Sequence, residues 1–256
     1  MSWIVFRGTF AKTLITMRRY LFNTLSGMFT MYLVFCLLFF GARALGGAVD
    51  MGDTLEGLVV GYFVWMLAIM AYSDLSWHLL NEAQVGTLEQ MYLTPVGFHW
   101  VNAAYLVSNL MIQLVLLGGV LFLMIVTSGQ QLVIDVFSML PLLLLTVTGA
   151  YGAGFMMGGL ALIYKRIQAS FQILQFVFVA FLTVPLARYP LARFLPLAMG
   201  NSLVRRIMVD GYSLFELPGT DVAIAFITGM AYLVGGLVVF RHCEKVARRD
   251  GLLGQY

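Results

Sequence analysis

Long gaps without any charged residue are the feature of this 256-residue chain that most limits how it can fold. Only 11% of the residues are Asp, Glu, Lys or Arg and 61% are hydrophobic, whereas about 25% of an average soluble domain is charged. A soluble fold of this size could not bury so much apolar surface, and the chain is not polar enough to be disordered. The remaining class is a polytopic membrane protein.

The uncharged gaps predict the membrane spans, because a charge at the centre of a span costs about 2.5–3.5 kcal/mol on insertion scales. Six gaps approach or exceed the roughly 20 residues that a span needs: Tyr20–Ala42, Gly57–Ser73, Trp100–Ile134, Val136–Tyr164, Ile167–Ala187 and Val222–Phe240. The second gap is short, so its helix is expected to continue past Asp74 toward Leu80. The expected fold class is therefore an all-α membrane protein with six transmembrane helices.

The distribution of Lys and Arg predicts that both termini are cytoplasmic. With that orientation ten basic residues near the spans lie inside and five lie outside, which agrees with the positive-inside rule. The inside set is Arg7, Lys12, Arg18, Arg19, Lys165, Arg166, Arg241, Lys245, Arg248 and Arg249. Residues 188–221 are discordant, since they place four Arg on the outer side. No basic face suited to nucleic acid is visible.

Residues 1–21 have the periodicity of an amphipathic helix. Their large apolar residues share one face, and Lys12 and Arg19 point the opposite way. We expect this helix to lie in the inner interface of the membrane, either as an anchor or as a lever joined to the first span.

The outer segment 188–221 is too charged to span the membrane and too apolar to be a free loop. We expect a helical hairpin or short helix that dips into the outer leaflet as a re-entrant element, with Arg206 paired to Asp210 at i,i+4. Leu203 and Arg206 are the candidate residues of an outer gate. The alternative is a solvated surface helix.

Residues 81–95 combine several signals of a short helix between two breakers. Gly86 favours a helix end, Thr87 and Gln90 match a capping box, and Pro95 limits helicity just before it. The predicted helix, Leu88–Leu93, carries three apolar residues with little of the chain to cover them: Leu88, Met91 and Tyr92. Such a helix suits the groove of a partner protein; alternatively, it lies on the inner leaflet.

The stretch Glu82-x3-Gly86-Thr87-Leu88-Glu89-x5-Pro95 resembles the glutamate–glycine–threonine–leucine–glutamate segment of permease subunits of the type-2 ABC exporter family. The chain is similar to these permeases in outline as well, with an amphipathic amino-terminal helix, six spans and an outer element before the last span. The pattern Leu195-Pro196-Leu197 followed by Arg205 and Gly211 resembles that outer element.

The resemblance implies that Leu88–Leu93 is a coupling helix seated in a separate ATP-binding cassette subunit. Glu82 and Glu89 would orient it or pair with basic groups of that partner, and the remaining coupling residues would be Gly86, Thr87, Met91, Tyr92 and Pro95. No Gly-Lys of a P-loop precedes Ser or Thr in this chain. ATP and magnesium are therefore expected on the partner subunit, with no cofactor, metal or catalytic residue on this chain.

The resemblance also implies two permeases, this chain with a second copy or a homologue, surrounded by lipid in the cell inner (cytoplasmic) membrane. The chain is then one transmembrane domain, 1–256. Its parts are the interfacial helix (1–21), spans one and two (22–80), the cytoplasmic coupling loop (81–97), spans three to five (98–187), the outer element (188–221), and span six with a cytoplasmic tail (222–256).

Two residue patterns are candidates for a substrate path. Gln168, Gln172 and Gln175 follow i, i+4, i+7 spacing in the fifth span, and uncharged amides in a span usually face protein or a cavity. Tyr62, Trp65 and Tyr72 form an aromatic stripe in the second span. Hydrogen bonding between helices and core packing are the alternatives for the two sets. In the fourth span, small residues at i+4 spacing predict close helix packing: Ala150, Gly154 and Gly158.

The expected function is that of the permease subunit of an ATP-driven exporter for a small amphipathic substrate, drug-like or lipid-like. A polysaccharide or glycolipid exporter of the same family is one alternative. An ion-coupled carrier or channel is another, but it needs acids or His inside the spans, and none is expected there. A membrane enzyme is disfavoured because no H-E-x-x-H or G-x-S-x-G motif occurs. Asp74, His78 and Glu82 could form a metal face, but we expect them to decorate the cytoplasmic end of span two.

Overall fold

The computed structural model describes residues 3–44, 54–164, 167–186 and 188–249 except for 86–97, and over this part of the chain it is helical, with no strand. The longer helices are α1 (Trp3–Arg19), α2 (Leu21–Ala44), α3 (Leu55–Val85), α5 (Phe98–Ser128), α6 (Val136–Ile163), α7 (Gln168–Thr183), α8 (Ala198–Met208) and α9 (Gly219–Arg249). Two short 3-10 helices, η1 (Pro190–Phe194) and η2 (Leu214–Glu216), flank α8. The all-α class expected from the sequence is confirmed.

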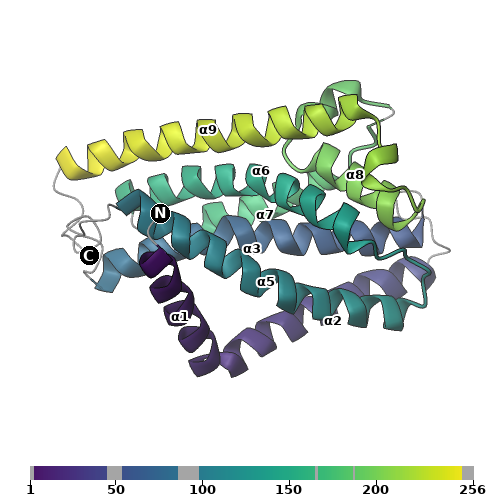
Figure 1. Ribbon diagram of the computed structural model, residues 1–256, viewed down its shortest axis with the longest axis horizontal. Helices are drawn as coiled ribbons and strands as arrows, with labels where there is room; N and C mark the ends of the chain where they lie inside the picture. The colour runs from purple at the N-terminus through teal and green to yellow at the C-terminus, as the bar shows by residue number, and fades with distance from the viewer. Residues whose placement is uncertain (1–2, 45–53, 86–97, 165–166, 187, 250–256) are drawn as a thin grey trace.

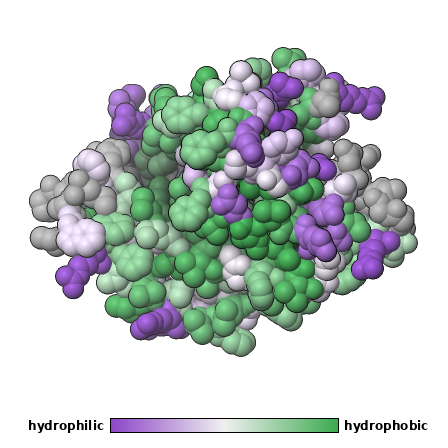
Figure 2. Space-filling model, turned by 45° about the vertical axis from the view of Figure 1, so that its right-hand side comes forward, coloured by the Kyte–Doolittle hydropathy of each residue, from purple (hydrophilic) through white to green (hydrophobic). Residues whose placement is uncertain are grey.

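Five of these helices contain stretches long and apolar enough to cross a membrane: Leu21–Ala44, Leu55–His78, Trp100–Ser128, Val136–Ile163 and Gly219–Ala247. They correspond to five of the six expected spans, and α3 continues past Asp74 as predicted. This is the architecture of a helical multi-pass membrane protein. Figure 2 agrees with it, since hydrophobic side chains cover much of the face shown.

The helix expected at Ile167–Ala187 is shorter than the sequence predicted. α7 has 16 residues, about 24 Å at 1.5 Å per residue, whereas the hydrocarbon core is about 30 Å thick. The helix stops before Pro185, because a proline disfavours helical geometry in the residue ahead of it, and Val184 is extended. Six membrane-length helices are therefore not confirmed.

Successive long helices run in alternating directions along the molecule (Figure 1). The end of α3, the start of α5 and the end of α9 gather at the end of the bundle where α1 begins, and α8 lies at the opposite end. The chain turns at Tyr20 between α1 and α2, so α1 crosses the bundle separately and packs on α5. Its aromatic face is continuous, with ring centroids 5.9 Å apart for Trp3 and Phe6 and 6.1 Å apart for Phe6 and Phe10.

α6 is the central helix and packs most extensively on α9 and α3. Its glycines allow backbone contact, as the small-residue pattern predicted. A Cβ on Gly152 would lie 2.3 Å from the carbonyl oxygen of Tyr232, and a Cβ on Gly236 would lie 2.1 Å from the carbonyl oxygen of Gly152. On the other side, a Cβ on Gly154 would lie 2.8 Å from the carbonyl oxygen of Tyr72. No side chain fits at these positions without separating the helices.

Gly236→Ala is expected to destabilise the protein, because the added methyl group meets backbone rather than a flexible side chain. Overpacking of this kind costs about 1–3 kcal/mol, which outweighs the roughly 1 kcal/mol by which Ala is the better helix former. Thermal unfolding in one detergent measures the effect. Gly119→Ala on α5 is the matched control, since nothing lies within 4 Å of its Cβ position. Equal melting temperatures for the two variants would contradict the role of close contact.

Candidate functional site

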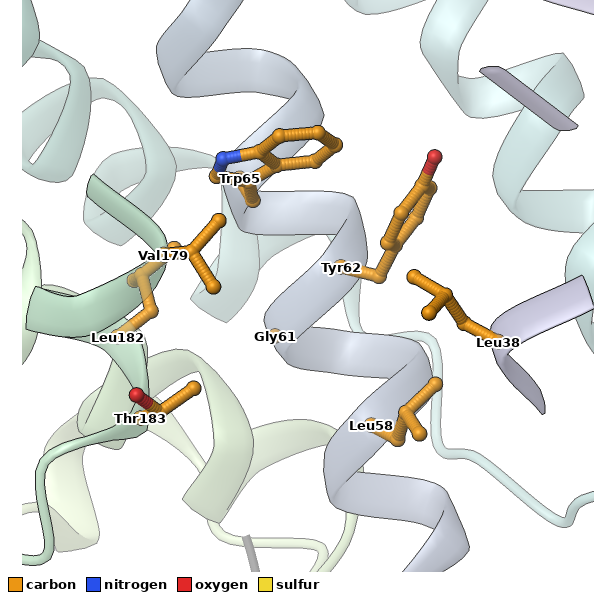
Figure 3. A pocket seen from close by; sticks show the side chains of 8 residues that line it. All are labelled: Leu38, Leu58, Gly61, Tyr62, Trp65, Val179, Leu182 and Thr183. Atoms are coloured by element: carbon orange, nitrogen blue, oxygen red, sulfur yellow. The ribbon is translucent and has the colours of Figure 1, made fainter. Parts of the chain in front are cut away.

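Two of the predicted path residues, Tyr62 and Trp65, line a small cavity between α2, α3 and α7 (Figure 3). The cavity has a volume of about 80 Å³. Its other walls are Leu38, Leu58, Gly61, Val179, Leu182 and Thr183. In Figure 3, the α7 side chains approach Trp65 from one side of α3, and Leu38 of α2 approaches Tyr62 from the other.

The polar atoms at this cavity already have partners in the protein. The Tyr62 hydroxyl donates to the carbonyl of Met31 at 2.7 Å, and the indole N–H of Trp65 donates to the carbonyl of Gln175 at 3.2 Å. The walls therefore offer an apolar surface. Drug-sized ligands need about 300–1,000 Å³, so in this conformation the cavity fits one small apolar group and not a whole substrate.

The remaining predicted path residues do not meet at this cavity. Tyr72 is fully buried; its hydroxyl donates to the carbonyl of Phe171 at 2.7 Å and its ring packs on Phe171 and Phe178. Gln172 is exposed on the outer face of α7, and Gln175 is half-buried. The side chain of Gln168 is outside the described residues. Among the described side chains, those of Gln172 and Gln175 therefore do not line the cavity that Tyr62 and Trp65 line.

Both candidate gate residues lie in α8. Leu203 is fully buried in the hydrophobic core, and Arg206 is partly exposed at a larger cavity. Arg206 pairs with Asp221 of α9 at 3.0 Å, whereas the i,i+4 spacing had suggested Asp210. Asp210 is exposed at the end of the helix, where solvent competes for it, so the partly buried Asp221 is the better partner.

The larger cavity lies at the α8 end of the molecule and has a volume of about 470 Å³. α7 contributes Leu182 and Thr183, which line the small apolar cavity as well. Four arginines line it, Arg188, Arg193, Arg205 and Arg206, with Asp221 as the one acidic residue of the lining. Guanidinium groups bind carboxylates and phosphates through paired hydrogen bonds. The cavity can therefore hold an acidic group next to apolar surface.

Sequence reasoning identified Arg206 of this cavity but missed Arg188, Arg193 and Arg205 as site residues. A signal was present, because four arginines on the outer side run against the positive-inside rule. Only the fold shows that these arginines share one cavity, since they come from the α7–η1 connection, η1 and α8.

The start of α6 is fixed at this same end of the molecule. The Asp135 carboxylate accepts hydrogen bonds from Ser138 and from the backbone N–H groups of Phe137 and Ser138. These hydrogen bonds lower the pKa of Asp135, and the one from the Ser138 side chain has the largest effect. The Ser138 hydroxyl oxygen also accepts from the backbone N–H of Leu214 at 3.0 Å, which ties η2 to α6.

The predicted coupling residues fall largely on a part of the chain that is not described. Glu82 lies in the last turns of α3. Outside the described residues lie Gly86, Thr87, Leu88, Glu89, Met91, Tyr92 and Pro95. Among the described residues no group of three or more His, Cys, Asp or Glu could hold a metal ion.

Comparison with known proteins does not assign the chain to a family. No family model matches it, and neither a curated protein nor a solved structure matches it.

Asp221→Asn is expected to lower the stability of the protein by about 1 kcal/mol, the usual size for a partly exposed charged hydrogen bond, because the acceptor for Arg206 then loses its charge. Thermal unfolding measures the loss. The matched control is Asp210→Asn, which removes the acid that the sequence pattern had suggested. An equal or larger loss for Asp210→Asn would show that the pairing of Arg206 differs in solution.

Proposed function

We propose that this chain is the permease subunit of an ATP-driven exporter of the type-2 ABC class, working with a separate ATP-binding subunit. The observation that carries the proposal is the position of the Glu82–Pro95 motif. It occupies the connection between α3 and α5, two membrane-length helices that end and begin at the same end of the bundle. A partner that moves this segment would act directly on both helices.

The charges support a cytoplasmic position for this end. α1 carries Arg7, Lys12, Arg18 and Arg19, and the last turns of α9 include Arg241, Lys245 and Arg249. α1 begins at the end of the bundle where α3 ends and α5 begins, and the last turns of α9 lie at that end too (Figure 1). By the positive-inside rule that end faces the cytoplasm. Both termini would then lie on the cytoplasmic side of the cell inner membrane.

The path of the chain supports α7 as a sixth crossing. α6 ends at the α1 end of the bundle and η1 and α8 lie at the opposite end, so α7 and the residues after it must connect the two (Figure 1). Together with the buried face of α8, this favours six crossings and an outer element that enters the membrane. α7 is shorter than the hydrocarbon core is thick. It would cross beside the larger cavity, where the neighbouring helices of the bundle cover the rest of the span.

The outer face of α7 supports a second permease copy. Ile173 and Phe176 are exposed there, and the amide of Gln172 is exposed with them. An amide facing lipid would lose its hydrogen bonds, whereas an amide facing a second copy or a central path could keep them. We therefore place the substrate path between two copies, along Gln168, Gln172 and Gln175.

The two cavities at the end of α7 favour an amphipathic substrate, drug-like or lipid-like. One is apolar and the other is rich in arginine, and Leu182 and Thr183 belong to both. A molecule with an apolar part and an acidic group would find both kinds of surface along α7.

A proton-coupled carrier is the second candidate, because one observation favours it. The sequence placed Asp74 at the edge of the second uncharged gap and predicted that the helix continues past it, and Asp74 lies within the membrane-length stretch Leu55–His78 of α3. Proteoliposomes prepared with this chain alone, and in parallel with the chain and a copurified ATP-binding subunit, separate the two functions. Substrate accumulation driven by a proton gradient supports the carrier, and accumulation that requires an ATP-binding subunit and ATP supports the exporter.

Leu88→Ala and Glu89→Gln are expected to weaken coupling to the ATP-binding subunit. Loss of a central apolar contact of an interface typically costs 1–2 kcal/mol, so ligand-stimulated ATP hydrolysis by the copurified complex should fall by about tenfold for Leu88→Ala. Glu56→Gln is the control, because Glu56 lies at the opposite end of α3. Unchanged stimulation in both coupling variants, or the absence of any ATP-binding subunit after crosslinking in membranes, would contradict the proposal.

A further inference from the structure

Asp74 lies on the side of α3 that faces α5. Its Oδ2 atom accepts hydrogen bonds from the side-chain amides of Asn109 and Gln113, one turn apart on α5. The sequence had suggested that Asp74 decorates the cytoplasmic end of span two. Asp74 lies four residues before the end of the membrane-length stretch Leu55–His78, and α3 continues to Val85. Asp74 is half-buried, and an acid inside a membrane-length stretch is a candidate functional group because a charge there is costly.

No cation offsets this carboxylate among the residues that the structure describes. On α3, His78 stacks on Tyr105 of α5, with ring centroids 3.8 Å apart. On α6, Tyr151 lies close enough to interact electrostatically with Asp74 and Tyr105. α7 has no titratable residue in its described sequence. Among the described residues, Asp74 therefore meets side-chain amides and aromatic groups.

The cationic side chains of the neighbouring elements lie elsewhere. Arg43 at the end of α2 and the two arginines of α8 are at the opposite end of the bundle. α1 packs on α5, and among the described residues no ion pair joins Asp74 to a basic group of α1. A charged Asp74 would rest on hydrogen bonds alone.

Gln113 supplies a second observation that points to a bound proton. Its side chain is 7% exposed, and while its Nε2 atom contacts Asp74, its Oε1 atom is buried without a hydrogen-bond partner in the described structure. Rotation of the terminal amide exchanges these two atoms. After that rotation, Oε1 would accept a hydrogen bond from a protonated Asp74, and Nε2 would take the position that has no partner among the described residues.

We propose that Asp74 is a proton-binding site within the α3–α5 contact, with Gln113 and Asn109 as its hydrogen-bonding partners. One proton adds to the carboxylate to give the neutral acid, and no other bond forms or breaks. The charged form accepts from both amides. The neutral form donates to Gln113 and still accepts from Asn109, so each protonation state has its own set of partners.

The position of the site links proton binding to the segment 86–97. Asp74 precedes the end of α3 by 11 residues and Asn109 follows the start of α5 by 11 residues, about 16 Å along each helix. Hydrogen bonds to a carboxylate are stronger than those to a neutral acid. Proton uptake therefore loosens the contact between the two helices that hold this segment. Any consequence for transport rests on the proposed function, but the proton site does not.

Labelling with dicyclohexylcarbodiimide tests the site, because this apolar reagent modifies protonated carboxyls in apolar surroundings. The full chain in lipid nanodiscs should be labelled at Asp74 at mildly acidic pH and lose this labelling at alkaline pH, as mapped by peptide mass spectrometry. Asp74→Asn removes the modified peptide and keeps the amide contacts, so it should fold. Asp210→Asn, at an exposed acid, leaves the labelling unchanged. Gln113→Leu removes a hydrogen bond that favours the charged form of Asp74. It is therefore expected to raise the pH of half-maximal labelling by about one unit, which corresponds to roughly 1.4 kcal/mol.

A second measurement does not depend on access of the reagent. The infrared difference spectrum between acidic and alkaline pH should contain a carboxylic-acid C=O band that is absent in Asp74→Asn and present in Asp210→Asn. Absence of this band from the wild-type chain, or its persistence in Asp74→Asn, would overturn the proposal. If Na⁺ protects Asp74 from labelling and choline does not, the ligand of the site is a metal cation and not a proton. These measurements use no ATP-binding subunit, so their failure is distinguishable from failure of the proposed function.

Discussion

The contact between α6 and α9 at backbone distance is the constraint on which the bundle depends. Gly152 and Gly236 face each other so closely that the carbonyl of one occupies the place of a side chain on the other. In a membrane the surrounding lipid is as apolar as the helices, so association relies on close packing and hydrogen bonds. Gly154 brings α3 to the other side of α6 in the same way. α6 is thus held between these two helices. α7 then packs on α3, and α8 packs on α6.

Hydrogen bonds between helices connect the rest of the bundle, and most of them end on backbone carbonyls. Tyr62, Trp65, Tyr72 and Ser76 of α3 donate to carbonyls of α2, α7 and α6. This use of aromatic side chains explains why the stripe on α3 offers so little polar surface to a ligand. The polar groups left for function lie elsewhere, at the arginine-rich cavity beside α8 and at the α3–α5 contact.

The helices were predictable from the sequence because the cost of burying charge acts on each residue separately. The gaps between charges located five membrane-length helices, and the continuation of α3 beyond Asp74 followed from the length that a span needs. α7 was overestimated because the count of uncharged residues ignored Pro185, which ends the helix. For the candidate sites, the sequence identified Arg206 as a residue of interest, but not its partner Asp221 or the arginines around it.

The sequence by itself therefore determined that the chain is helical, that it belongs in a membrane, and that α6 can pack closely. The tertiary structure alone decided which polar residues meet. Asp74 contacts Asn109 and Gln113 across 35 and 39 positions of sequence, and Arg206 contacts Asp221 across 15. Hydropathy and helical periodicity report which face of a helix a residue occupies. They do not report which other helix that face touches, because this depends on how the whole bundle packs.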